Sequence, residues 1–88
     1  MDIGELRSGI DAIDQQLTDL FIQRMALSAA IGSYKKERGL PIHVPQRERE
    51  IIEKLSQMAS HELAPYVARL YEQIFALSRD YQKELSEG

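Results

Sequence analysis

The most constraining feature of this sequence is a helical repeat of apolar positions that continues for about a third of the chain. Its members are spaced alternately four and three residues apart, and they are Leu6, Ile10, Ile13, Leu17, Leu20, Arg24, Leu27, Ile31 and Tyr34. Residues at this spacing fall on one face of an α-helix. The pattern therefore predicts one long helix that carries a single charged residue, Arg24, on its apolar face.

Signals at both ends bound this helix. Asp2 and Glu5 form an acidic version of a capping box, and Gly39 followed by Pro41 is a typical helix end. A helix over residues 3–38 would be roughly 50 Å long, whereas a compact chain of this length is roughly 30 Å across. Because the apolar stripe runs along the whole helix, the overhanging half requires cover from another chain. A two-fold copy is the most economical cover, so we expect an intertwined homodimer.

Two shorter helices should follow. Pro41 and Pro45 forbid a helix over residues 39–45, so we expect an extended connector there and a second helix that begins near Pro45. The expected inward residues of this second helix are Glu48, Ile51, Leu55 and Met58. After a turn over residues 60–64, Pro65 should open a third helix. Its expected inward residues are Val67, Leu70, Ile74, Leu77 and Tyr81. No alternating run indicates a strand, so we predict a single all-α domain over residues 1–88 with three helices per chain.

The composition argues against several classes of function. The chain has no Cys, and its two His residues lie 18 positions apart, so we expect no metal site. The formal net charge of -3 argues against general binding to nucleic acids or anionic membranes, because both require a basic surface. The sequence has no apolar run long enough for a transmembrane helix and no basic, signal-like start, so we expect a cytoplasmic protein.

Polar residues at inward positions are the candidates for a binding site. They are Arg24 and Lys35 on the first helix, Arg47 and Glu48 on the second, and Ser78 and Gln82 on the third. Arg24 and Lys35 differ by only about 20° around the helix axis, and Ser78 and Gln82 are i,i+4 neighbours that can face one pocket. Each residue also has an ordinary structural interpretation. An inward Arg and Glu can pair across a helix seam, a lysine near a helix end can match the helix dipole, and Ser78 and Gln82 can lie on the surface.

A family resemblance rests on short motifs that occur in order from about Glu5 to Gln82. They are Leu6-Arg7, Ile13-Asp14, Arg24 before an apolar stretch, Ile31-Gly32-x-x-Lys35, Pro41-Ile42, Arg47-Glu48-Arg49 and Ser78-x-x-x-Gln82. Their order and spacing together resemble the all-helical chorismate mutases. The resemblance implies a cofactor-independent enzyme that converts chorismate into prephenate by a Claisen rearrangement, on the path to phenylalanine and tyrosine.

The same resemblance implies a role for individual residues. Arg24 and an Arg7 donated by the partner chain would clamp the two carboxylates of chorismate. Lys35 and Gln82 would reach the ether oxygen, and Glu48 would take the ring hydroxyl. Negative charge builds on the ether oxygen as the C–O bond breaks, so fixed donors there lower the barrier more than they bind the ground state.

Three further positions complete these implied roles. Arg47 and Ser78 match contacts of second rank in the resemblance. Val44 stands where many relatives carry an acidic residue, and we expect this difference to affect substrate affinity rather than activity. The reaction is unimolecular and pericyclic, so positioning groups suffice without a general acid, a base or a metal.

Three other functions remain open at this point. One is an isochorismate-pyruvate lyase of the same fold, although Glu48 favours the mutase because isochorismate carries its hydroxyl elsewhere on the ring. The second is a non-catalytic regulatory or dimerisation domain of a larger protein. The third is a plain coiled-coil scaffold, which leaves the inward polar residues on all three helices without an explanation.

Overall fold

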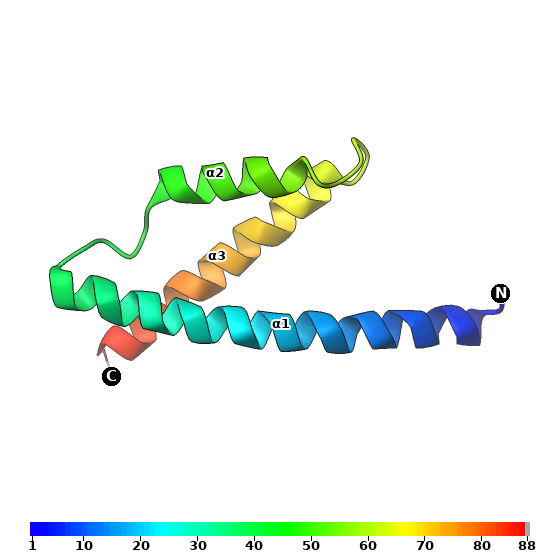
Figure 1. Cartoon of the computed structure of the whole chain (residues 1–88), viewed down its shortest axis with the longest axis horizontal. Helices are drawn as coiled ribbons and strands as arrows, with labels where there is room; N and C mark the ends of the chain where they lie inside the picture. Colours follow the sequence, from blue (N-terminus) through cyan, green and yellow to red (C-terminus); the bar gives the residue numbers. More distant parts are fainter. Residues whose placement is uncertain (88) are drawn as a thin grey trace.

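A computed structural model describes residues 1–87, and it contains three helices: α1 (Ile3–Arg38), α2 (Pro45–Ser56) and α3 (Ala64–Glu87). The C-terminal half of α1 lies beside α3, and its N-terminal half extends beyond both other helices (Figure 1). No strand occurs in residues 1–87, so the prediction of an all-α fold with a long first helix is confirmed. None of the helices in this range has an apolar stretch long enough to cross a membrane.

Both ends of α1 lie where the sequence predicts them. The side chain of Asp2 accepts a hydrogen bond from the backbone N–H of Glu5 at 2.8 Å, which satisfies one of the free donors of the first turn. At the other end Gly39 has φ 64°, a left-handed conformation that glycine adopts without steric cost. Its N–H donates to the carbonyls of Lys35 and Lys36, which closes the helix.

The molecule is elongated because α1 is longer than the rest of the fold. Its principal extents are 54 × 28 × 14 Å, and its radius of gyration is 16.0 Å. A compact chain of this length has a radius of gyration of about 12 Å. Among residues 1–87, α3 packs against α1 and against α2, while α1 and α2 do not pack against each other. The third helix therefore fixes the positions of the other two.

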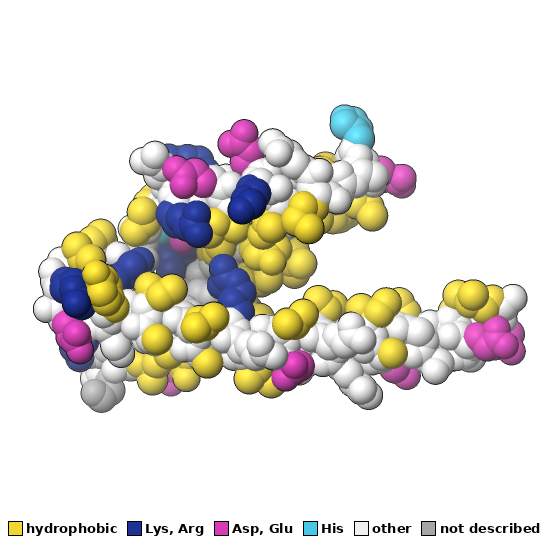
Figure 2. Space-filling model, in the orientation of Figure 1, with side chains coloured by type: hydrophobic (Ala, Val, Ile, Leu, Met, Phe, Trp, Pro, Cys, Tyr) yellow, Lys and Arg dark blue, Asp and Glu magenta, His cyan; other side chains and the backbone are white. Residues whose placement is uncertain are grey.

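The apolar stripe of α1 is not the face that contacts α3. The apolar members of that stripe are between 49% and 68% exposed, from Leu6 to Tyr34, and Figure 2 shows apolar side chains along the overhanging part of α1. The contacts with α3 come from the neighbouring face, where Met25, Ser28 and Gly32 approach Ser78 and Gln82. Small residues let two helices come close together. The apolar residues of the stripe are thus exposed in both halves of α1, and not only in the overhanging half for which the sequence predicts a partner.

Two predictions about the region between α2 and α3 are wrong. Met58 is not an inward residue of the second helix, because α2 ends at Ser56 and Met58 is 81% exposed. The turn ends one residue early, since Ala64 already belongs to α3. The backbone N–H of Ala64 bonds to the carbonyl of Ser60 at 2.9 Å, so the helical turn begins before Pro65.

The inward face of α3 also differs from the prediction. Leu70 and Leu77, expected to face inward, are 52% and 49% exposed. The buried residues of α3 are Phe75, Ser78 and Gln82. Each of them directly follows a residue that was expected to face inward. The physical reason is that α3 lies between two helices, and that Ser78 and Gln82 approach the face of α1 that carries Ser28 and Gly32.

Candidate active site

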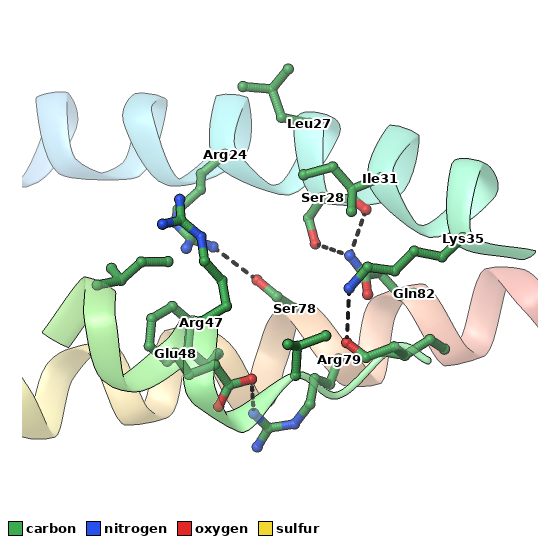
Figure 3. Close-up of a pocket in the computed structure, with 14 residues that line it drawn as sticks. Arg24, Leu27, Ser28, Ile31, Lys35, Arg47, Glu48, Ser78, Arg79 and Gln82 are labelled. Carbon is green, nitrogen blue, oxygen red and sulfur yellow. Dashed lines mark hydrogen bonds and ion pairs between the residues drawn. The ribbon is translucent and has the colours of Figure 1, made fainter. Parts of the chain in front are cut away.

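A cavity of about 520 Å³ lies where the three helices meet. Figure 3 shows side chains from all three helices pointing into it. Six of the seven predicted site residues line the cavity, namely Arg24, Lys35, Arg47, Glu48, Ser78 and Gln82. The seventh, Arg7, does not reach it, because Arg7 is exposed on the overhang, about 25 Å from Arg24 along the helix axis.

Helical spacing explains why these side chains share one space. The residues that α1 contributes follow a helical period, and they are Arg24, Leu27, Ser28, Ile31 and Lys35. The residues that α3 contributes do so as well, and they are Phe75, Ser78, Arg79 and Gln82. Positions three or four residues apart lie on the same side of a helix. The first two turns of α2 supply the third wall, so α3 sets the distance between the α1 wall and the α2 wall.

Arg24 is held in the cavity by polar and aromatic contacts. Its Nη1 donates to Ser78 Oγ at 3.1 Å, and Ser78 Oγ in turn donates to Met25 Sδ at 3.8 Å. The guanidinium carbon lies 5.9 Å from the ring centroid of Tyr71 and 5.5 Å from that of Phe75. Both distances are in the range of cation–π attraction. The inward arginine therefore pairs with a serine and two rings rather than with Glu48.

Gln82 is buried against α1, with 8% of its surface exposed. Its Nε2 donates to the backbone carbonyl of Ser28 at 2.8 Å and contacts Ser28 Oγ at 3.0 Å. Because a backbone carbonyl only accepts hydrogen bonds, the nitrogen side of the amide must face α1. One turn further on, Gly32 leaves room for this side chain, since a Cβ there would lie 2.9 Å from Gln82 Cγ. Ser28 and Gly32 together form a cradle that fixes Gln82.

The acidic and basic residues near α2 are also paired. Arg79 Nη1 bonds to Glu48 Oε2 at 2.5 Å, and His43 Nε2 lies 3.6 Å from Glu48 Oε1. Lys35 Nζ donates to the backbone carbonyl of Ile42 at 3.1 Å, which ties the connector to the end of α1. These contacts close the side of the cavity that the connector forms.

The electrostatics and the walls of the cavity indicate its ligand. Four cationic side chains and one carboxylate line it, in a chain whose formal net charge is -3. The cations are Arg24, Lys35, Arg47 and Arg79. Apolar side chains cover other parts of the wall, Ile51 and Phe75 among them. Such a space can bind a small anion with an apolar ring and present fixed N–H donors to one of its oxygens.

Two polar lining residues, Ser28 and Arg79, are missing from the predicted site residues. Ser28 is four positions after Arg24, and Arg79 is three positions before Gln82. Ser28 lies on the same helix face as Arg24, and Arg79 on the same face as Gln82, and this spacing could have identified them from the sequence. Within residues 1–87 no group of three or more His, Cys, Asp or Glu residues lies close enough to hold a metal ion.

The model of the chorismate mutase type II family matches residues 6–83 of this chain. The chain belongs to this family. The matched segment contains Arg7 and all six predicted residues that line the cavity. The resemblance that the motifs indicated is thereby confirmed for nearly the whole chain.

Two of the following three curated relatives carry chorismate mutase in their names. The bifunctional chorismate mutase/prephenate dehydratase of Aquifex aeolicus is 46% identical over 57 residues, which are 65% of this chain and 16% of that protein. The T-protein of Haemophilus influenzae is 46% identical over 44 residues, or 50% of this chain and 12% of that protein. The chorismate mutase of Methanocaldococcus jannaschii is 30% identical over 56 residues, or 64% of this chain and 57% of that protein.

The chain spans less than two thirds of the length of each of these relatives. It spans 16% of the length of the Aquifex protein and 12% of the Haemophilus protein. No solved structure matches the chain. Family membership therefore rests on the family match and on the curated relatives.

Proposed function

We propose that this chain is a chorismate mutase that converts chorismate into prephenate by a Claisen rearrangement, without a cofactor. One observation carries the proposal: Arg24, Lys35 and Gln82 come from two helices and line one cavity with apolar walls. Chorismate is a dicarboxylate with a ring, so it matches both the positive charge and the apolar surface of this space. The names of the relatives from Aquifex aeolicus and Methanocaldococcus jannaschii support the same reaction.

The chemistry of each side chain suits one part of the substrate. The planar fork of Arg24 suits a carboxylate, and its contact with Ser78 holds that fork in place. Lys35 and Gln82 donate to the ether oxygen, where negative charge develops as the C–O bond breaks. Gln82 has two N–H protons. One stays on the carbonyl of Ser28, and the other exchanges Ser28 Oγ for the substrate oxygen.

A second chain completes the site in this proposal. A single chain leaves the apolar stripe of α1 exposed and places Arg7 about 25 Å from Arg24 along the helix. In an intertwined homodimer the two stripes cover each other, and the Arg7 of one chain reaches the cavity of the other. The second carboxylate of chorismate then has its own arginine.

The direct test is loss of chorismate absorbance on addition of the pure protein, with prephenate identified as the product. Arg24→Ala should abolish most of this activity, whereas Arg69→Ala, a change of an exposed arginine on α3, should not. A folded protein that leaves chorismate unchanged would contradict the proposal and favour a regulatory or dimerisation domain. Formation of salicylate and pyruvate from isochorismate, without prephenate from chorismate, would instead identify a lyase.

A further inference from the structure

The ion pair between Arg79 and Glu48 occupies a special place in the fold. Within residues 1–87 it is the only side-chain hydrogen bond that joins α2 to another helix. The other side-chain hydrogen bonds between helices of this range join α1 to α3: Arg24 to Ser78, Ser78 to Met25, Gln82 to Ser28 and Lys36 to Ser86. Among the hydrogen bonds between helices, the Glu48 carboxylate is therefore tied to the rest of the site by one arginine of α3.

We propose that Arg79 is a positioning residue that orients the Glu48 carboxylate for the ring hydroxyl of the substrate. This inference rests on the proposed function and adds to it a residue that the family resemblance does not supply. Arg79 occupies Glu48 Oε2, and Oε1 faces the connector, 3.6 Å from His43 Nε2. One carboxylate oxygen is thus fixed by the protein, and the other has lone pairs for a hydroxyl donor. Figure 3 shows Arg79 reaching Glu48 from below the cavity.

The position of Arg79 on α3 links this contact to the rest of the site. Its neighbour Ser78 binds Arg24, and Gln82, one turn on, binds Ser28. The same turn of α3 therefore contacts α1 on one side and α2 on the other. In the proposed site this turn therefore fixes the distance between Glu48, which accepts the ring hydroxyl, and Gln82, which donates to the ether oxygen.

Arg79 also explains why the Glu48 carboxylate is compatible with a site that binds a dianion. Among residues 1–87, Glu48 is the only acidic side chain that lines the cavity, and 22% of it is exposed. A bare carboxylate there would repel the two carboxylates of chorismate. Arg79, itself 30% exposed, compensates that charge at close range, and a partly buried pair is screened by salt less than a surface pair. The other basic group beside Glu48 is His43, which is 56% exposed on the connector.

The first test replaces Arg79 and measures chorismate kinetics. Arg79→Met should raise KM roughly tenfold with a smaller change in kcat, because the hydroxyl contact is made to substrate and transition state alike. Arg79→Lys keeps a cation that reaches the carboxylate, so it should recover part of the loss. Arg69→Met, an exposed arginine on the same helix, should match the parent. Circular dichroism and thermal unfolding show whether each variant folds.

The second test distinguishes a role of Arg79 in orienting the Glu48 carboxylate from a role in holding α2 against α3. With a chorismate analogue that lacks the ring hydroxyl, Arg79→Met should lower kcat/KM clearly less than it does with chorismate, because only the repulsion by the uncompensated Glu48 carboxylate is left. In a Glu48→Gln background, Arg79→Met should cause no further loss of kcat/KM. An equal loss with the analogue and with chorismate, or a further loss in the Glu48→Gln background, would overturn the inference, since Arg79 would then act on the substrate or on α2 as a whole. An active parent with an unaffected Arg79→Met variant overturns the inference alone, whereas an inactive parent overturns the proposed function as well.

Discussion

The orientation of the Gln82 amide is set by the backbone of α1. The acceptor at 2.8 Å from its Nε2 is the carbonyl oxygen of Ser28, which no substitution at position 28 removes. An amide turned the other way would place two acceptor oxygens against each other, at a cost comparable to a lost buried hydrogen bond. The fold therefore selects one of the two amide orientations before substrate binds.

This orientation predicts the behaviour of Gln82→Glu. At neutral pH the new carboxylate would face the carbonyl of Ser28 and the ether oxygen, so kcat/KM should fall by at least about a hundredfold. A carboxyl group donates only when protonated, so activity should recover as the pH falls towards about 4.3, the ordinary pKa of glutamic acid. The measurement is kcat/KM of the mutant and the parent from about pH 4.5 to about pH 8.

Gln73→Glu is the matched control, because Gln73 is an exposed residue of the same helix. It makes the same change of charge outside the cavity and should follow the parent at every pH. An active Gln82→Glu enzyme whose rate does not vary with pH would show that Gln82 is not directed at the reacting oxygen.

At the level of single residues, the sequence identifies Arg24 and Glu48 as site residues but not Ser28 and Arg79, which hold other site residues in place. Arg24 and Glu48 interrupt apolar stripes, so the pattern alone marks them, and the family resemblance adds a role to each. Ser28 and Arg79 interrupt nothing, because a serine or an arginine on a helix is usually a solvated residue. Their contacts depend on how α3 packs, which local periodicity does not encode.

At the level of elements, the contact between α1 and α3 depends on small residues. Periodicity identifies the long apolar stripe of α1 but does not say which helix covers it. In the structure α3 packs on the face of α1 beside the stripe, where Ser28 and Gly32 allow close approach of Gln82. Leu70 and Leu77 are consequently exposed in the single chain, and the prediction of an inward stripe through them was wrong.

Gly32→Ala tests this close contact. Alanine is the better helix former by about 1 kcal/mol, so the propensity term alone would stabilise the fold. The added Cβ would lie 2.9 Å from Gln82 Cγ and 3.2 Å from its Cβ, so Gln82 or α3 must move. Overpacking of this kind costs about 1–3 kcal/mol, and we expect a lower free energy of unfolding together with a roughly tenfold loss of kcat/KM.

Gly9→Ala provides the control for Gly32→Ala, since both glycines lie inside α1 and no atom of the chain lies within 4 Å of a Cβ at Gly9. It should keep parental kcat/KM. Denaturant unfolding and steady-state kinetics of the three proteins give the comparison. A Gly32→Ala protein with unchanged stability and activity would show that Gln82 is not confined by α1.

At the level of the whole molecule, the overhang of α1 was predictable because it follows from the number of residues between two helix caps. The rise per residue fixes the length of such a helix whatever its neighbours are. The extent of the uncovered surface was not predictable in the same way. It includes Leu27, Ile31 and Tyr34 in the half of α1 that lies beside α3, because α3 packs on a different face.

The uncovered stripe predicts a dimer in solution. Sedimentation equilibrium should give twice the chain mass of 10.1 kDa down to low micromolar concentration. Leu17→Glu places a charge in the middle of the stripe and should dissociate or unfold the protein, because an unpaired charge is costly to bury. Gln16→Glu, an exposed position beside the stripe, should leave the mass unchanged. A stable, folded monomer of the parent would contradict the prediction.

The last prediction concerns the source of the second arginine. Arg7 and Arg24 are 17 residues apart on one straight helix, so they lie about 25 Å apart along its axis and cannot clamp one small dianion from the same chain. In the proposed dimer each cavity uses Arg24 of its own chain and Arg7 of the partner chain. Arg7→Ala and Arg24→Ala should each leave a substrate carboxylate unpaired, so either homodimer should be nearly inactive.

Mixing the two inactive variants distinguishes a composite site from a site within one chain. When they are unfolded and refolded together, about half of the dimers are mixed, and each mixed dimer has one cavity with both arginines and one with neither. Activity should therefore return to about a quarter of the parent value. If chain exchange is demonstrated by mass spectrometry and no activity returns, then Arg7 does not act in trans. The exposed stripe of α1 would still require a partner, but that partner would no longer be part of the active site.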